Sequence, residues 1–232
     1  MTNVNRDFAD RVNEINLYFD FMENIIIKNG KLQYPDATVQ VISTDLVKIF
    51  KANSFLILYN LSESCIKNSV EEIYNTIYAT NVSYDKLKEG LKREIISFLK
   101  KNINAQDFAS SINEIANDII LKCFDTERLF SGNLDAREIR KLATNYGFSY
   151  SVVPIANPDG TFTNLDSGDL LTVKSQRNDL AHGTFSFKDC GKNYTIQDLI
   201  KIKNHVIEYL RQILKNIETY ITNSEYLAVV TV

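Results

Sequence analysis

Arg177 and His182 are the residues whose types and spacing offer the clearest chemistry in this sequence. Arginine binds phosphate oxygens through a planar fork of donors, and histidine gives and takes protons near neutral pH. Asn178, directly after the arginine, adds an amide that can hold either the imidazole or a phosphate. Because an arginine and a histidine together can cleave a phosphodiester, we take Arg177, Asn178 and His182 as candidate catalytic residues.

The segment that carries these residues is typical of a helix that ends at Gly183, since glycine often terminates helices. Asn178 and His182 are four residues apart and share a face of such a helix. Arg177 and His182 would lie about 140° apart around the axis, at roughly 100° per residue. A cation at the end of a helix is also favoured by the helix dipole alone. Spacing by itself therefore leaves a catalytic pair and an ordinary helix end both open.

The composition is that of an ordinary globular protein, with 232 residues, 44% hydrophobic and 24% charged. No segment resembles a linker, so we expect a single domain over residues 1–232. The formal net charge of −3 excludes a strongly basic protein that coats nucleic acid, but it allows a local cationic site. Cys65, Cys123 and Cys190 are widely spaced, which favours inert thiols in a reducing cytoplasm over disulfides.

Neither a membrane segment nor a cofactor site is expected. The sequence has no apolar run long enough to cross a bilayer, and residues 1–8 lack the apolar core of a signal peptide. His182, Cys190 and His205 do not follow the spacing of a four-ligand metal site. We therefore expect no metal and no other cofactor, and we assign His205, in the final helix, no catalytic role.

Apolar residues recur at three- and four-residue steps, which predicts an all-α fold of long antiparallel helices. Few prolines and glycines interrupt them. The helices are expected at about residues 5–28, 44–79, 83–101, 105–124, 135–146, 167–182 and 195–221. Residues 184–194 are expected to be a loop. Residues 148–153 and 226–232 are rich in β-formers, which allows a minor β-hairpin between these two segments, and 157–160 is a turn.

Two polar features do not belong to this apolar pattern. Asn60 and Glu63 interrupt the most apolar helix, and we interpret them as a mutual hydrogen bond rather than as catalytic groups. Residues 86–101 form the most basic segment, which is either a solvated face or an RNA contact. Its cations are Lys86, Lys88, Lys92, Arg93, Lys100 and Lys101.

The order of these elements resembles the HEPN superfamily, in particular the MAE-like branch of stand-alone bacterial HEPN proteins, which are ribonuclease-toxin-like. A long apolar helix carries Tyr-Asn-Leu-Ser-Glu-Ser at residues 59–64. Well over a hundred residues later comes Arg-Asn-Asp-Leu-Ala-His-Gly at 177–183, and a long helix closes the chain. The Phe-Ser-Gly-Asn-Leu sequence at 130–134 is also similar to that branch. The resemblance covers about residues 44–221, and its most specific part is Arg177-Asn178 followed by His182.

The resemblance implies a HEPN-type helical bundle that dimerises and cleaves RNA without metal. Arg177 and His182 would be the catalytic pair and Asn178 the supporting polar residue. Some toxin members carry a tyrosine two residues after the histidine, where this chain has Thr184. The resemblance therefore does not extend to regulation through that tyrosine.

RNA supplies its own nucleophile, the 2′-hydroxyl, so the function expected here is a metal-independent endoribonuclease. The histidine would move the proton, and the arginine would stabilise charge on phosphorus-bound oxygens. Acid and base roles are best filled by two histidines, which a symmetric homodimer supplies. We expect a toxin or phage-defence effector. The alternatives are a non-catalytic HEPN module that binds RNA or a partner protein, and a toxin silenced by an antitoxin encoded elsewhere.

Overall fold

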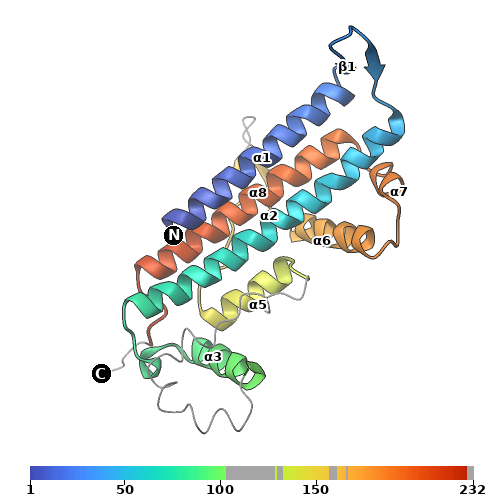
Figure 1. Cartoon of the computed structure of the whole chain (residues 1–232). Coiled ribbons are helices and arrows are strands. Elements are labelled where there is room, and N and C mark those ends of the chain that lie inside the picture. Colours follow the sequence, from blue (N-terminus) through green and yellow to red (C-terminus); the bar gives the residue numbers. More distant parts are fainter. Residues whose placement is uncertain (103–128, 130–132, 157–160, 166, 229–232) are drawn as a thin grey trace. The chain divides into compact units, whose positions relative to one another are not determined.

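The computed structural model describes residues 1–102, 129, 133–156, 161–165 and 167–228 (Figure 1). Its helices are α1 (Thr2–Ile26), α2 (Thr44–Ala79), α3 (Glu89–Asn102), α5 (Ala136–Tyr146), α6 (Ser167–Ala181), α7 (Phe187–Gly191) and α8 (Ile196–Thr222), with a 3-10 turn, η1 (Tyr84–Lys86). Two antiparallel hairpins pair β1 (Lys31–Gln33) with β2 (Val39–Val41) and β3 (Ile155–Ala156) with β4 (Phe162–Thr163). The predicted all-α fold with a minor β-hairpin is confirmed, although the hairpins lie at other residues than those predicted.

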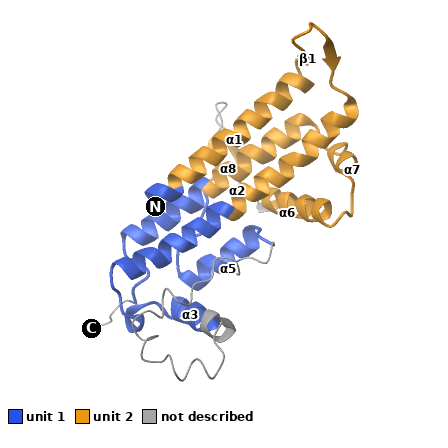
Figure 2. Cartoon of the chain, in the orientation of Figure 1, with its two compact units in different colours: residues 1–4, 64–152, 211–232 blue, residues 5–63, 153–210 orange. Residues whose placement is uncertain are grey.

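The chain forms two compact units, coloured separately in Figure 2. Unit 1 comprises residues 1–4, 64–152 and 211–232, and unit 2 comprises residues 5–63 and 153–210. Both α2 and α8 contribute residues to each unit, so no linker in the sequence marks the division. The expected single domain stays a prediction.

Unit 2 contains the segments that carry the candidate residues. Within it, α1, the first half of α2 and the first half of α8 run side by side (Figure 2). Each helix buries one apolar stripe, which includes Phe8, Ile15, Phe19, Met22, Ala52, Phe55, Leu58, Leu61, Leu199, Val206 and Leu210. Each fully buried large side chain contributes about 1.5–3 kcal/mol relative to an exposed one.

Polar contacts set the positions of these helices in unit 2. The Tyr18 hydroxyl donates to the Phe50 carbonyl at 2.5 Å, and burial raises the pKa of Tyr18. Lys203 Nζ donates to Asn16 Oδ1 at 3.0 Å and lies 5.1 Å from the centroid of the Phe19 ring. Side chains of α1 therefore bind both α2 and α8.

The short helix α7 was predicted to be loop. Ser186 caps it, because its hydroxyl oxygen accepts from the Asp189 N–H at 3.1 Å, and Cys190 is buried. A Cβ on Gly191 would lie 1.9 Å from the Lys48 carbonyl oxygen. Only glycine permits this approach of α7 to the backbone of α2. The five-residue helix is too short for apolar periodicity to reveal it.

Unit 1 is organised by a cluster of buried aromatic rings. Tyr74, Tyr146, Phe148, Tyr220 and Tyr226 pack edge to face, with ring centroids 6.0–6.5 Å apart. The hydroxyls of Tyr74 and Tyr146 lie 3.1 Å apart, and the Tyr220 hydroxyl donates to the Tyr146 carbonyl at 2.6 Å. Burial raises the pKa of both Tyr146 and Tyr220. The last carbonyls of a helix have no partner within it, and the Tyr220 hydroxyl supplies a donor to the one of Tyr146 at the end of α5.

Helix α5 agrees with its prediction, whereas the helix expected at 83–101 does not. Asp135 caps α5, and Gly147 follows its last residue in the left-handed conformation. The Ser83 hydroxyl bonds the Asp85 carboxylate at 2.5 Å instead of capping a backbone N–H. The chain is extended at Leu87, which is fully buried, so a 3-10 turn and a shorter α3 replace one helix.

The predicted pairing of the C-terminal tail with residues 148–153 is wrong. Leu227 forms a bridge with Leu87, and the Ala228 N–H donates to the Lys86 carbonyl at 2.8 Å. Residues 148–153 form no strand. The predicted turn at 157–160 and the predicted helix at 105–124 lie outside the described residues. Within the described part of the chain, no helix is both long and apolar enough to cross a membrane.

Replacing Tyr220 by Phe should lower the free energy of unfolding by about 1–3 kcal/mol, because the buried Tyr146 carbonyl loses its donor. Urea denaturation followed by circular dichroism measures this change. Tyr78→Phe is the matched control, since Tyr78 is 48% exposed. Equal stability of the Tyr220 variant and the control would show that the hydroxyl contributes nothing.

Candidate active site

Helix α6 ends in a way that fixes the backbone of His182. The Thr184 N–H donates to the Asp179 carbonyl at 2.8 Å, and the Gly183 N–H donates to the Leu180 carbonyl at 3.3 Å. Gly183 has a φ of 70°, the left-handed conformation that this helix ending requires. His182 follows the last helical residue, and its own N–H donates to the Asn178 carbonyl at 2.9 Å. The predicted end of the helix at Gly183 is confirmed.

One face of α6 is buried and the opposite face is open. Leu170, Val173 and Leu180 are buried, whereas Leu171, Ser175 and His182 are exposed. In the described structure the His182 imidazole makes no hydrogen bond or ion pair. The ring is therefore accessible to a substrate or to a partner chain.

Arg177 is held in place by neighbouring side chains. Its guanidinium carbon lies 4.3 Å from the centroid of the Tyr59 ring, and its Nη1 donates to Asn178 Oδ1 at 2.8 Å. A guanidinium over a tyrosine face gains about 0.5–2 kcal/mol, depending on how far it is desolvated. Tyr59 is buried, so the ring is a rigid support on α2. This orders the arginine before any ligand arrives.

Asn178 connects the two other candidate residues. Its side-chain oxygen accepts from Arg177, while its backbone carbonyl accepts from the His182 N–H. The sequence predicted that the amide would hold the imidazole or a phosphate, and in this structure the amide oxygen orients the arginine. The catalytic roles of all three residues stay predictions.

Asn60 has a different partner from the one predicted. Its Oδ1 accepts from Arg11 Nη1 at 2.8 Å, and Asp7 accepts from Arg11 Nε at 2.9 Å. In the described structure no hydrogen bond joins Asn60 to Glu63. The long arginine side chain of α1 reaches Asn60 across the helix pair, a contact that spacing within α2 cannot reveal.

His205 and Asp169 form a contact that the sequence did not indicate. Nδ1 of His205 lies 2.6 Å from Asp169 Oδ2, and the two side chains are only 10% and 21% exposed. Asp169 lies in the first turn of α6 and His205 lies on α8. The pair therefore ties the start of the candidate helix to the core of unit 2. The separation of 36 residues hides this pairing from any local sequence pattern.

Of the three residues weighed as metal ligands, His205 and Cys190 have other partners. His205 bonds Asp169, and the Cys190 thiol donates to Gln176 Oε1 at 3.3 Å. Burial raises the pKa of Cys190 to about 11, so its thiol stays protonated at neutral pH. Across the described ranges, no group of three His, Cys, Asp or Glu side chains could hold a metal ion.

The basic segment of unit 1 is partly engaged within the chain. Lys88 Nζ lies 5.4 Å from the centroid of the Tyr220 ring, and Lys92 Nζ donates to Glu89 at 2.9 Å. These contacts favour a structural use of the two lysines. They do not test the alternative of RNA contact by the other cations of the segment.

Comparison with known protein families shows which family the chain belongs to. The model of the MAE_28990-like HEPN family matches residues 1–226, which is nearly the whole chain. The chain therefore belongs to this HEPN family, and the predicted relationship is confirmed. Searches of curated proteins and of solved structures each found no match.

His205→Leu should lower the free energy of unfolding by about 1–3 kcal/mol, because a mostly buried carboxylate loses its donor. His205→Asn keeps a donor near the position of Nδ1 and should recover part of that loss. Asn204→Leu, an exposed change on the same turn of α8, is the control. Chemical denaturation measures all three, and equal stability of the Leu and Asn variants would contradict the role of the hydrogen bond.

Proposed function

We propose that this HEPN protein is a metal-independent endoribonuclease whose catalytic residues are Arg177, His182 and Asn178. One observation carries the proposal. On α6, the guanidinium of Arg177 is held by Tyr59 and Asn178, while the imidazole of His182 is exposed and has no partner in the described structure. An ordered cation and an accessible proton carrier within six residues of one helix end suit phosphodiester chemistry. HEPN domains are often ribonucleases or RNA-binding modules.

The reaction needs no atom beyond those of the RNA and the protein. A neutral imidazole takes the proton of the 2′-hydroxyl, whose oxygen then bonds to phosphorus. The bond between phosphorus and the 5′-oxygen breaks, and a protonated imidazole gives that oxygen its proton. The products are a 2′,3′-cyclic phosphate and a 5′-hydroxyl. Arg177 stabilises the negative charge that grows on the non-bridging oxygens.

A homodimer would supply the second imidazole. Each chain carries one copy of the motif, and acid and base roles are best filled by two histidines. Exposed apolar side chains lie on the open face of α6 and just after the helix, since Leu171 is 50% exposed and Phe185 is 49% exposed. A two-fold axis near His182 would bury these side chains and bring the two motifs together.

The proposed setting is a toxin or a defence effector in the cytoplasm. An enzyme that cuts cellular RNA must be restrained, and an antitoxin or another defence-complex protein would provide that restraint. The competing proposal is a non-catalytic HEPN module that binds RNA or a partner protein. RNA binding without cleavage by the intact chain would support that second reading.

His182→Ala should leave RNA binding intact and reduce cleavage by roughly 10²- to 10⁴-fold, because proton transfer is lost. Arg177→Ala should weaken both binding and cleavage, since the arginine acts on the ground state and the transition state. Gel-based cleavage of mixed RNA and filter binding measure the two effects. Gln197→Ala, an exposed change in the first turn of α8, is the control.

The same assay tests the chemistry of the products and the need for metal. Cleavage should persist in excess chelator, and the products should end in a 2′,3′-cyclic phosphate. RNA with a 2′-deoxy sugar at the cut position should bind and stay intact. Loss of activity with EDTA that magnesium or manganese restores would refute the mechanism, and so would products with an ordinary 3′-hydroxyl.

Leu171→Asp should convert a dimer into monomers and lower the cleavage rate at the same protein concentration by roughly tenfold or more, because it places a charge in the proposed interface. Leu17→Asp is the matched control, since Leu17 is 71% exposed on α1 of the same unit. Sedimentation equilibrium at micromolar concentration measures the association. A parent protein that is monomeric yet fully active would show that one chain suffices.

A further inference from the structure

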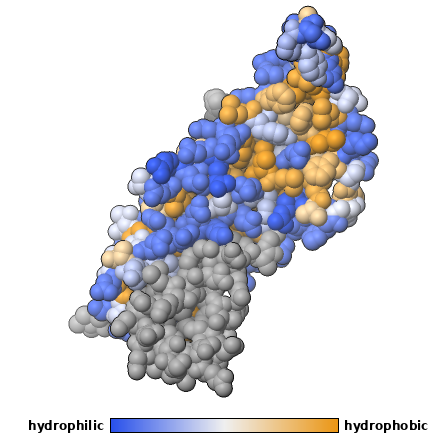
Figure 3. Space-filling model, in the orientation of Figure 1, coloured by the Kyte–Doolittle hydropathy of each residue, from blue (hydrophilic) through white to orange (hydrophobic). Residues whose placement is uncertain are grey.

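The β1–β2 hairpin exposes apolar side chains at the end of unit 2. Leu32, Tyr34, Val39 and Val41 are between 41% and 68% exposed, and every residue of the two strands is exposed. Ile27, just before the hairpin, is 50% exposed. Figure 3 shows further apolar surface next to the hairpin, with hydrophilic residues around it. Exposed apolar side chains that gather in one place mark sites of interaction.

Both strands of the hairpin have an open edge, since in the described structure this sheet consists of β1 and β2 alone. The Tyr34 N–H donates to the Thr38 carbonyl at 2.8 Å, which makes this a hydrogen-bonded pair. Bonded and non-bonded pairs alternate along antiparallel strands, so the backbone groups at positions 31, 33, 39 and 41 point away from the hairpin. No backbone group of the described chain bonds them there. Such an edge is a template for a further strand.

One face of the hairpin borders a cavity of about 450 Å³. Lys31 and Val41 are register partners, so their side chains lie on the same face, and both line the cavity. Its other apolar lining residues are Ile25, Ile26, Ile42 and Val47, and no Asp or Glu is among the residues that line it. The cavity can therefore receive an apolar side chain of a segment that lies on the hairpin.

Lysines outnumber carboxylates around the hairpin. Residues 28–51 and 187–192 contain six lysines and three aspartates, although the net charge of the whole chain is −3. Lys31 takes part in no ion pair in the described structure, and Lys51 Nζ donates to the Tyr194 carbonyl at 2.7 Å rather than to a carboxylate. The surplus of positive charge on this part of unit 2 is complementary to an acidic partner.

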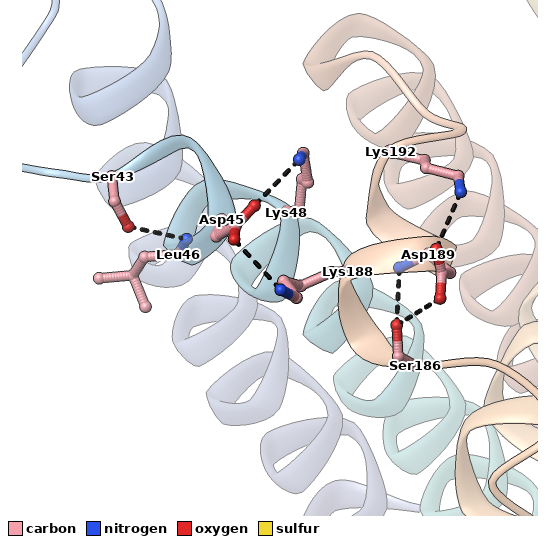
Figure 4. A network of polar contacts seen from close by, with 8 residues as sticks. All are labelled: Ser43, Asp45, Leu46, Lys48, Ser186, Lys188, Asp189 and Lys192. Carbon is pink, nitrogen blue, oxygen red and sulfur yellow. Dashed lines mark hydrogen bonds and ion pairs between the residues drawn. The ribbon is translucent and has the colours of Figure 1, made fainter.

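Two of the three aspartates hold lysines at the surface next to the hairpin. Lys48 Nζ contacts Asp45 at 3.0 Å, and Lys192 Nζ contacts Asp189 at 2.8 Å, as Figure 4 shows. Gly191 packs against the Lys48 carbonyl, which places the second lysine next to the first turns of α2. Exposed ion pairs of this kind are weak, so carboxylates of a partner can compete for the same lysines.

The combination of features selects the kind of partner. A second copy of the chain would bring two lysine-rich faces together, and like charges that face each other across strands are destabilising. A nucleic acid would use the lysines, but it has no peptide groups to pair with the open edges and would leave the exposed aliphatic side chains without a partner. An acidic polypeptide in an extended conformation uses the edge, the apolar side chains and the charge together.

We propose that the β1–β2 hairpin is the docking site for an extended, acidic segment of a partner protein, which adds a strand to the hairpin. The backbone of the segment pairs with the open edge, an apolar side chain enters the cavity, and carboxylates lie on Lys31 and the neighbouring lysines. This surface is separate from the residues of the proposed active site. The proposal therefore stands or falls without regard to RNA cleavage.

Selection of short random peptides displayed on phage against the immobilised full chain tests the proposal. Selected peptides should be enriched in Asp and Glu over Lys and Arg and should carry apolar residues, because the hairpin presents both lysines and aliphatic side chains. The peptide that binds most tightly is then synthesised, and fluorescence polarisation measures its affinity. Two further versions are N-methylated, each at one of the two sets of alternate backbone amides. At least one of them should bind about tenfold or more weakly, since it cannot add a strand.

Two pairs of single variants separate the effects of charge and of apolar contact. Lys31→Glu should weaken the selected peptide about tenfold or more, whereas Lys201→Glu, an exposed change on α8 with the same effect on net charge, should stay within about threefold of the parent. Val41→Ser should weaken binding about fivefold, whereas Leu17→Ser should stay within about twofold. Val41 and Leu17 are matched in exposure, at 68% and 71%. All four side chains are exposed, so the variants should keep the melting temperature of the parent.

Several results would overturn the proposal. Selection of no peptide, or equal losses in the hairpin variants and their controls, would show that the hairpin is not a docking site. Unchanged affinity of both N-methylated peptides would show that no strand is added. A 2′-O-methyl oligoribonucleotide that displaces the peptide and binds the Val41→Ser chain as tightly as the parent would assign the face to nucleic acid. Self-association of the parent that Val41→Ser abolishes in sedimentation equilibrium would assign it to a second copy.

Discussion

The geometry of one helix decides how the candidate residues are presented. Five steps along α6 turn the chain so that Arg177 and His182 cannot project in the same direction. Arg177 lies against the buried Tyr59 ring, and His182 stands exposed at the end of the helix. An arginine that packs inward is ordered by the core, while a histidine that projects outward depends on what binds there. A site that uses both is therefore completed from outside the helix, by the substrate or by a second copy of the chain.

Both ends of α6 are fixed, so the directions in which Arg177 and His182 project are defined. At the start, Asp169 bonds His205 of α8. At the end, the hydrogen bonds of Gly183 and Thr184 close the helix. A rotation of α6 about its axis would break the Asp169 contact and lift Arg177 from Tyr59. The polar contacts therefore hold the direction in which His182 projects, and apolar burial of Val173 and Leu180 holds the helix against the unit.

Long-range periodicity and local caps explain which parts of the fold the sequence predicted. The bounds of α2, α5 and α8 follow from apolar repeats over many turns and from Asp135 and Thr195 at two helix starts. The same reasoning failed where tertiary contacts override local preference. Leu87 leaves the helical pattern because it is buried and paired with Leu227. The β1–β2 hairpin was not predicted, since its strands are three residues long and all their residues are exposed, so no alternation of buried and exposed positions marks them.

The sequence predicted only those residues of the candidate site whose side chains have a distinctive chemistry. Arg177, Asn178 and His182 are close in sequence, so one pattern contains them all. Tyr59 was part of the resemblance but received no role, because nothing in the sequence places a ring of α2 under an arginine of α6. The same limit applies to the cations that the fold gathers in unit 2. The sequence draws attention to residues 86–101, where basic residues are contiguous, and two of those lysines are engaged within unit 1. Lys31, Lys48, Lys51 and Lys192 instead line one cavity of unit 2, although no local window of the sequence joins them. An acidic net charge of −3 therefore does not describe the field that a ligand meets, because that field depends on which charges the fold brings to one place.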